Sequence, residues 1–175
     1  GYQFGSRWFG CWKREGHGSL NFVGALEHSC DVYFYQVGQK LGLERLDEAA
    51  RSFGMGAVTG IDLPQEKQGL VPNHEWYEKN WGKRSHQAVM LNLAIGQGEL
   101  LATPLQMALS AAVAGTQGRS VRPHIVQEVR GVPDFVKPHS GRPRDNANAD
   151  KWAAVRLGLE HVVASGTGRA AQVPG

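Results

Sequence analysis

The sequence predicts a helix-rich chain with little β-sheet, on three observations. Apolar residues recur at the three- to four-residue spacing of a helix face in the stretches 22–28, 32–40, 44–53, 104–115 and 152–162. One segment alone, residues 121–129, combines the length and the β-branched content of a strand. Glycine supplies 23 of the 175 residues, which indicates many tight turns between the helices.

Residues with known preferences for helix ends mark where these helices begin and stop. Asn21 can cap the first helix, while Gly42 and Gly54 follow the last apolar residues of the second and third. Thr103 and Gln106 form a capping box, with a proline at the first helical position between them. Local signals therefore predict helix boundaries independently of the apolar spacing.

We expect residues 1–175 to be part of one domain. Residues 1–19 are aromatic and glycine-rich and are expected to be a loop that leads into the domain. Residues 20–115 should form its helical part. The remainder, 116–175, should hold the strand, a proline-rich surface loop over 131–148, and the last helix, which we expect to end in a flexible turn at 165–168.

Composition excludes several classes of protein. The formal net charge is only +3 and the Lys and Arg residues are scattered, so we expect no nucleic acid as a partner. No apolar run approaches the roughly 20 residues of a membrane-spanning helix. The two cysteines, Cys11 and Cys30, fit no metal-ligand spacing and no disulfide framework. We therefore expect no metal and no cofactor.

A polar tripeptide, Ser29-Cys30-Asp31, interrupts the apolar pattern between the first two helices. Ser and Asp compete with the backbone for hydrogen bonds and favour helix starts and turns. One interpretation is an N-cap, in which Ser29 or Asp31 accepts from the N–H groups of the following helix. The other is a catalytic mount, because the break would hold a hydroxyl and a carboxylate in place over a core. Local evidence favours the cap.

Three segments together favour the catalytic interpretation. They are Ala25-Leu-x-x-Ser-Cys-Asp-x-Tyr-Phe-Tyr35, Thr59-Gly-Ile-Asp-Leu-Pro64, and Ala94-Ile-Gly-Gln-Gly-x-Leu-x-Ala-Thr-Pro-Leu-Gln106. In this order they resemble the transpeptidase domain of the penicillin-binding proteins, most closely the monofunctional class that works in cell elongation. The resemblance implies an α/β fold of the β-lactamase and transpeptidase type, an antiparallel sheet flanked by helices. The chain would supply mainly the helical part of that fold, with few strands.

The resemblance also implies a function. Such enzymes are peptidoglycan D,D-transpeptidases, which cross-link cell-wall stem peptides ending in D-Ala-D-Ala through a serine acyl-enzyme, and β-lactams mimic the donor. The expected partners are therefore stem peptides, β-lactams and the membrane-bound proteins of an elongation complex. The expected location is the periplasmic face of the bacterial inner membrane, with the anchor upstream of this chain.

The family resembles the serine β-lactamases in using Ser-x-x-Lys, Ser-x-Asn and Lys-Thr/Ser-Gly motifs. Only the second is present here, as Ser29-Cys30-Asp31, with Asp in place of the commoner Asn. The nucleophile is expected before Gly1 and the strand motif after Gly175, so we do not expect this chain alone to form an acyl-enzyme. By the resemblance, Ser29 would relay a proton and Asp31 would orient groups or bind substrate. Gln97 could contact substrate, although packing is the simpler role.

Several alternatives stay open. The chain could come from a septal transpeptidase, from a β-lactamase-like relative, or from a non-catalytic scaffold with the penicillin-binding fold. Asp62 and Glu66 could suggest a glycosidase pair, but both fall in a turn-rich loop, where we expect a structural role. His17 and His28 flank the tripeptide and are expected to be solvated or hydrogen-bonded rather than catalytic. Cys30 is expected to be buried and inert.

Overall fold

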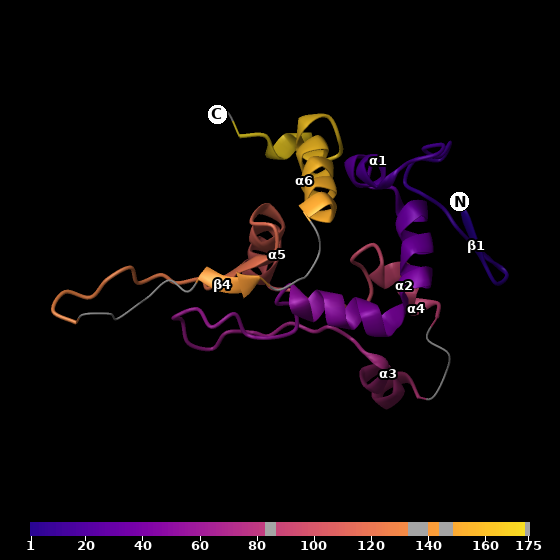
Figure 1. Ribbon diagram of the computed structural model, residues 1–175. Coiled ribbons are helices and arrows are strands. Elements are labelled where there is room, and N and C mark those ends of the chain that lie inside the picture. The colour runs from indigo at the N-terminus through magenta and orange to yellow at the C-terminus, as the bar shows by residue number, and fades with distance from the viewer. Residues whose placement is uncertain (83–86, 133–139, 144–148, 174–175) are drawn as a thin grey trace. The chain divides into compact units, whose positions relative to one another are not determined.

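The computed structural model describes residues 1–82, 87–132, 140–143 and 149–173, and helices make up most of its secondary structure (Figure 1). The helices are α1 (Phe22–Glu27), α2 (Asp31–Ser52), α3 (His74–Trp81), α4 (Val89–Leu93), α5 (Pro104–Gly115), α6 (Ala149–Ala164) and a short 3₁₀ helix η1 (Arg169–Ala171). The strands are β1 (Tyr2–Phe4), β2 (Arg7–Phe9), β3 (Arg119–Val121) and β4 (Ser140–Pro143). The expectation of a helix-rich chain with few strands is confirmed. Within the part that the structure describes, no helix is both long and apolar enough to cross a lipid bilayer.

The chain folds into two compact units. The first unit comprises Gly1–Leu46, Asn73–Gly98 and Ala149–Gly175. The second comprises Asp47–Pro72 and Glu99–Asn148.

In the first unit, α1 packs against α6 (Figure 1). Asn21 caps α1 as predicted, since its side chain accepts from the N–H of Gly24 at 2.9 Å. The two helices approach closely because Gly158 of α6 has no side chain, and a Cβ there would lie 2.5 Å from Leu26. This contact brings the C-terminal end of α1 next to the C-terminal end of α6, where the candidate site lies.

Helix α2 consists of two arms separated at Gly42. The backbone of Gly42 is non-helical, with φ of 78° and ψ of 165°, a conformation that glycine adopts without a steric penalty. The arms correspond to the second and third predicted helices, so the predicted stop at Gly42 is confirmed. The first arm packs on the end of α4, where a Cβ at Gly38 would lie 2.5 Å from Cβ of Ala94.

Helices α3 and α4 were not predicted. In α3, Asn73 accepts from the N–H of Trp76 at 2.9 Å as an N-cap. The ring of Tyr77 is fully buried and makes edge contacts with its helical neighbours Trp76 and Trp81. In the sequence these aromatic residues are interspersed with charged ones, which obscured the periodicity. Helix α4 is only one turn long and is too short to show a period.

In the second unit, the predicted capping box of α5 is confirmed. The N–H of Gln106 donates to the Thr103 hydroxyl at 3.1 Å, and the N–H of Thr103 donates to the Gln106 side chain at 2.9 Å. The loop from Gly54 to Pro72 is confirmed as irregular, apart from one bridge between Leu70 and Leu101.

Three sequence predictions about strands are wrong. Residues 1–19 are not all loop, because β1 and β2 pair antiparallel around a two-residue turn. Gly5 occupies the left-handed region there with φ of 57°, as such hairpin turns require. Residues 121–129 are not a strand: β3 ends at Val121, and Pro123 removes an N–H that a ladder would need. Most of the predicted loop over 131–148 lies outside the described residues, but Ser140–Pro143 within it form strand β4, so the loop prediction is wrong for these residues.

Candidate active site

The connection between α1 and α2 is a tight turn built on Ser29. The N–H of Ser29 donates to the carbonyl of Leu26, and the N–H of Cys30 donates to the carbonyl of Ala25, each at 3.0 Å. These two bonds form the Schellman motif, in which the residue just past the end of the helix, usually a glycine, has a left-handed backbone. Ser29 takes that conformation with φ of 48°, at a cost of roughly 1 kcal/mol. A serine held in a strained turn indicates a role beyond ending the helix.

The hydroxyl of Ser29 is exposed, and its oxygen lies 2.6 Å from Oγ1 of Thr167. Thr167 belongs to the turn at 165–168 that follows α6. This turn is attached to α1, because the N–H of Thr167 donates to the carbonyl of Glu27 at 3.1 Å, and its flexibility stays a prediction. Gly166, one of the glycines that suggested flexibility, lets the turn lie close to the end of α1. A Cβ at this position would collide with the Glu27 carbonyl.

Asp31 begins α2, and its carboxylate bonds to a residue distant in sequence. Oδ2 of Asp31 accepts from the backbone N–H of Trp12 at 3.2 Å. The indole N–H of Trp12 lies within hydrogen-bonding distance of the carbonyls of His28, at 3.0 Å, and Ser29, at 3.1 Å. Trp12 therefore ties the segment before α1 to the turn between α1 and α2. The interpretation in which Ser29 or Asp31 caps the following helix is wrong, because the side chains of these two residues bond to Thr167 and Trp12.

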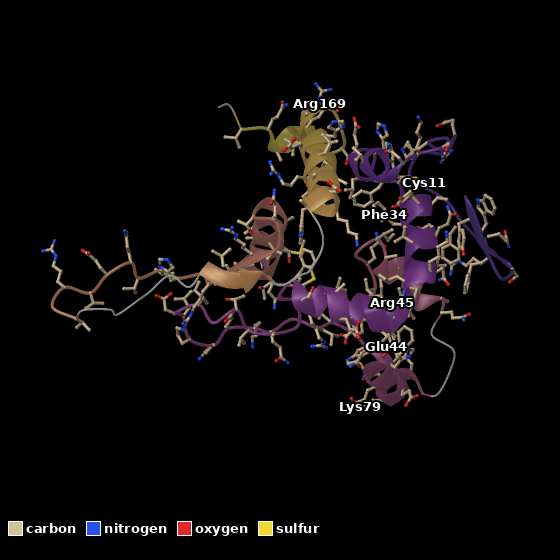
Figure 2. The ribbon with its side chains drawn as sticks, in the orientation of Figure 1. Cys11, Phe34, Glu44, Arg45, Lys79 and Arg169 are labelled. Carbon is tan, nitrogen blue, oxygen red and sulfur yellow. The ribbon has the colours of Figure 1, made fainter. Side chains whose placement is uncertain are left out.

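An open hollow of about 270 Å³ lies beside the tripeptide. It is lined by Leu26, Ser29, Asp31, Phe34, Ala94 and Ile95, and Phe34 projects from the first arm of α2 (Figure 2). The structure thus brings the tripeptide and the start of the Ile95–Gly98 segment to one place. That segment is a tight turn, as predicted, in which the N–H of Gln97 donates to the carbonyl of Asn92 at 2.9 Å. The Gln97 side chain is exposed and is not among the lining residues.

A second group of polar side chains, which we call the thiol cluster, consists of Cys11, His17 and Cys30. Their donor atoms all lie within 4.8 Å of one another, and Sγ of Cys11 is 3.5 Å from Nδ1 of His17. The His17 ring stacks on His28 with ring centres 5.6 Å apart. Burial lowers the pKa of the His17 imidazole and raises the pKa of the buried Cys30 thiol.

Two thiols and an imidazole are ligands that suit a soft divalent cation such as Zn²⁺, which would ionise the thiols on binding. The thiol cluster therefore could hold a metal, which the sequence did not indicate. The separations between residues 11, 17 and 30 match no metal motif, and the donors meet only because the segment before α1 folds over the α1–α2 turn.

Comparisons with known proteins agree with this geometry. The sequence profile of the penicillin-binding protein transpeptidase domain matches residues 1–175. This chain belongs to the penicillin-binding protein transpeptidase family. Peptidoglycan D,D-transpeptidase MrdA of Acinetobacter baumannii is 35% identical over 165 residues, which cover 93% of this chain and 25% of that protein. MrdA of Escherichia coli K12 is 36% identical over 152 residues, or 85% of this chain and 24% of that protein. The chain thus spans about a quarter of the length of these relatives.

Solved structures of the family share the fold. Penicillin-binding protein 2 (PBP2) from Helicobacter pylori superposes with a TM-score of 0.81 at 34% identity, over 94% of this chain and 30% of that chain. PBP2 from Pseudomonas aeruginosa, in complex with WCK 5153, superposes with a TM-score of 0.80 at 32% identity. The superposition covers 97% of this chain and 38% of that chain. The predicted α/β transpeptidase fold, represented here mainly by its helices, is confirmed.

One group beside the tripeptide had no counterpart in the sequence analysis. The Glu27 carboxylate accepts from the Ser165 hydroxyl at 2.6 Å and lies 3.1 Å from Nδ1 of His161. The bond from Ser165 has the largest effect in lowering the pKa of the Glu27 carboxyl group, and the bond with His161 lowers this pKa further. The partners are more than 130 residues apart in sequence, so no local pattern could have indicated them.

In the second unit, Asp62 and Glu66 have the structural role that the sequence predicted. Asp62 accepts from the N–H groups of Ile125 and Val126 at 2.7 and 2.8 Å, and these bonds lower the pKa of its carboxyl group. Glu66 accepts from the N–H groups of Thr59 and Gly60, at 2.6 and 3.0 Å. Both carboxylates fasten loops.

Proposed function

We propose that this chain is part of a peptidoglycan D,D-transpeptidase of the elongation type, which cross-links stem peptides ending in D-Ala-D-Ala through a serine acyl-enzyme. The observation that carries the proposal is the strained, exposed Ser29 next to Asp31 at an open hollow. The match over residues 1–175 to the transpeptidase domain supports it, and we assign all 175 residues to that domain. Both PBP2 structures superpose better than penicillin-binding protein 3 from Mycobacterium tuberculosis, whose TM-score is 0.66.

In this proposal Ser29 carries a proton between other groups. The nucleophilic serine forms a bond to the D-Ala carbonyl carbon, and the bond from that carbon to the leaving amine breaks. The proton of the nucleophile passes to a neighbouring lysine, and the leaving amine takes its proton from Ser29, which is reprotonated by the lysine. The chain contains no Ser-x-x-Lys and no Lys-Thr/Ser-Gly, so these groups would have to come from outside the 175 residues.

Asp31 is proposed to orient groups rather than to act as a base. Its carboxylate is held by the N–H of Trp12 at the edge of the hollow. A negative charge there would favour the protonated form of a nearby lysine, which opposes a role in deprotonating the nucleophile. Asp31 therefore suits the binding of the substrate amide. Gln97, exposed on the turn that follows Ile95, is proposed as a further substrate contact.

Relatives suggest the surroundings in which the protein works. A structure of PBP2 from H. pylori is a complex with MreC, and another similar structure is that of a peptidoglycan synthase complex. We propose that this protein likewise acts with elongation-complex proteins at the periplasmic face of the inner membrane. β-Lactams are its proposed inhibitors.

The test uses the protein expressed from its complete open reading frame. Purified wild type, Ser29→Ala and a control, Ser19→Ala, are exposed to a fluorescent penicillin, and covalent labelling is followed over time. Ser19 is exposed in the loop before α1 and serves as the matched serine. We expect rapid labelling of wild type and control, and labelling slower by about 100-fold in Ser29→Ala. A folded wild type that takes no label would contradict the enzyme and favour a scaffold.

A further inference from the structure

The nearest polar partner recorded for the Ser29 hydroxyl is Thr167, on a segment 138 residues away in sequence. We propose that Thr167 positions the relay hydroxyl of Ser29, and that Glu27 in turn holds the Thr167 turn in place. This inference rests on the proposed function. It adds a positioning residue from outside the three motifs of the family.

The contact between the two hydroxyls is short and is set by backbone geometry on both sides. The Ser29 Oγ to Thr167 Oγ1 distance is 2.6 Å, at the short end of the range for O–H···O hydrogen bonds. Ser29 is placed by its left-handed backbone, and Thr167 by the bond from its N–H to the carbonyl of Glu27. Neither position depends on a long side chain, so the geometry is preorganised.

The turn that carries Thr167 is fastened to α1 through the Glu27 side chain as well as its backbone. One carboxylate oxygen accepts from Ser165, which lies two residues before Thr167, and the other faces His161 in the last turn of α6. Gly166 allows the backbone to reach Glu27, because any side chain at that position would collide with the Glu27 carbonyl. Glu27 therefore makes three separate bonds, one to the last turn of α6 and two to the turn that carries Thr167.

The chemistry of two hydroxyls explains why such a partner is useful. Each hydroxyl donates one proton and can accept two hydrogen bonds. When Thr167 donates to Ser29, the Ser29 proton is free to point towards the hollow, where the leaving amine of the substrate would lie. When Ser29 has given that proton up, Thr167 remains as a donor to the oxygen until the lysine reprotonates it. Thr167 gains and loses no proton over the cycle, so it is a positioning residue.

The test removes the Thr167 hydroxyl without changing the shape of the side chain. Full-length Thr167→Val and Thr167→Ser are compared with wild type, with Thr116→Val as a matched control. The Thr116 hydroxyl bonds to backbone carbonyls, those of Ala112 and Val113 in α5 and that of Arg119 in β3. Labelling rates are measured over a range of fluorescent penicillin concentrations, which separates the rate of acylation from the affinity. Circular dichroism melting checks that each variant is folded.

We expect Thr167→Val to lower the acylation rate about tenfold at unchanged affinity, and Thr167→Ser to stay within about twofold of wild type. In a Ser29→Ala background, Thr167→Val should have no additional effect, because the hydroxyl it would position is gone. A purely structural role would not produce this dependence on Ser29. Thr116→Val should label as wild type does.

Two results would overturn the inference while leaving the proposed function intact. One is labelling of Thr167→Val at the wild-type rate. The other is an equal slowing of labelling by Thr167→Val with and without Ser29. A wild type that takes no label would instead overturn the proposed function, and the inference with it.

Discussion

Two polar residues from the motifs of this chain, Ser29 and Gln106, lie in contrasting surroundings. Gln106 is fully buried at the start of α5, and its amide makes hydrogen bonds to the N–H of Thr103 and to the carbonyls of Ala57 and Gln68. Ser29 is exposed, has a strained backbone and bonds through its side chain to Thr167. A motif residue with every bond made inside the protein serves the fold, while one held at the surface at a conformational cost is available for chemistry.

The largest effect on stability is expected at Gln106. Replacing it with Ala would leave the Thr103 N–H and the carbonyls of Ala57 and Gln68 without their partner. We expect Gln106→Ala to lower the free energy of unfolding by about 3 kcal/mol or more, measured by urea denaturation of the full-length protein. The control Gln127→Ala, at an exposed glutamine, should cost less than about 0.5 kcal/mol. If both variants lost the same free energy of unfolding, Gln106 would not have the structural role that distinguishes it from Ser29.

The thiol cluster is a third case, because two thiols and an imidazole meet within 4.8 Å of one another. One equivalent of Zn²⁺ should bind, and metal at about 100 times its Kd should stabilise the protein by about 2.7 kcal/mol. The measurements are metal content after dialysis and the melting temperature with and without a chelator. Both effects should vanish in Cys11→Ala and persist in His28→Ala, which lacks only the stacked ring. Unchanged metal content in Cys11→Ala would refute the site.

A smaller effect concerns pH and the loop carboxylate Asp62. Its pKa is lowered in the folded protein by the bonds from Val126 and Ile125. A carboxyl group with a lowered pKa stabilises the fold above its unfolded pKa, and this stabilisation is lost as the pH falls through the folded pKa. Asp62→Asn should therefore be less stable than wild type at pH 7, and the gap should narrow below about pH 4. Urea denaturation between pH 7 and pH 3 measures the gap, and a constant gap would contradict this role.

The sequence predicted those parts of the fold that depend on neighbouring residues. Asn21, the glycine break in α2 and the capping box at Thr103 all act within four residues, and each was confirmed. Helix α3 was missed because charged residues hide its buried Tyr77, and the β1–β2 hairpin because its strands are only three residues long. Short elements carry too little periodicity to be recognised.

The residues of the candidate site likewise fall into those that a local pattern indicates and those that only long-range contacts bring together. Ser29 and Asp31 were found from a local polar break and a family resemblance, whereas Thr167 lies far away in sequence and was assigned to a flexible turn. The thiol cluster was missed for the same reason, since Cys11 and Cys30 meet only after folding. Long-range contacts of this kind depend on how α1 packs on α6 and on how residues 11–17 fold over the turn. No local pattern encodes either.

The most direct test of the account is the Ser29→Gly variant of the full-length protein, measured for both stability and penicillin labelling. Glycine suits the left-handed turn without strain, so we expect the free energy of unfolding to stay level or rise by about 0.5 to 1 kcal/mol. Labelling should slow by about 100-fold, because the relay hydroxyl is gone. A variant that is clearly destabilised yet labels at the wild-type rate would show that Ser29 serves the fold, and would contradict the central claim.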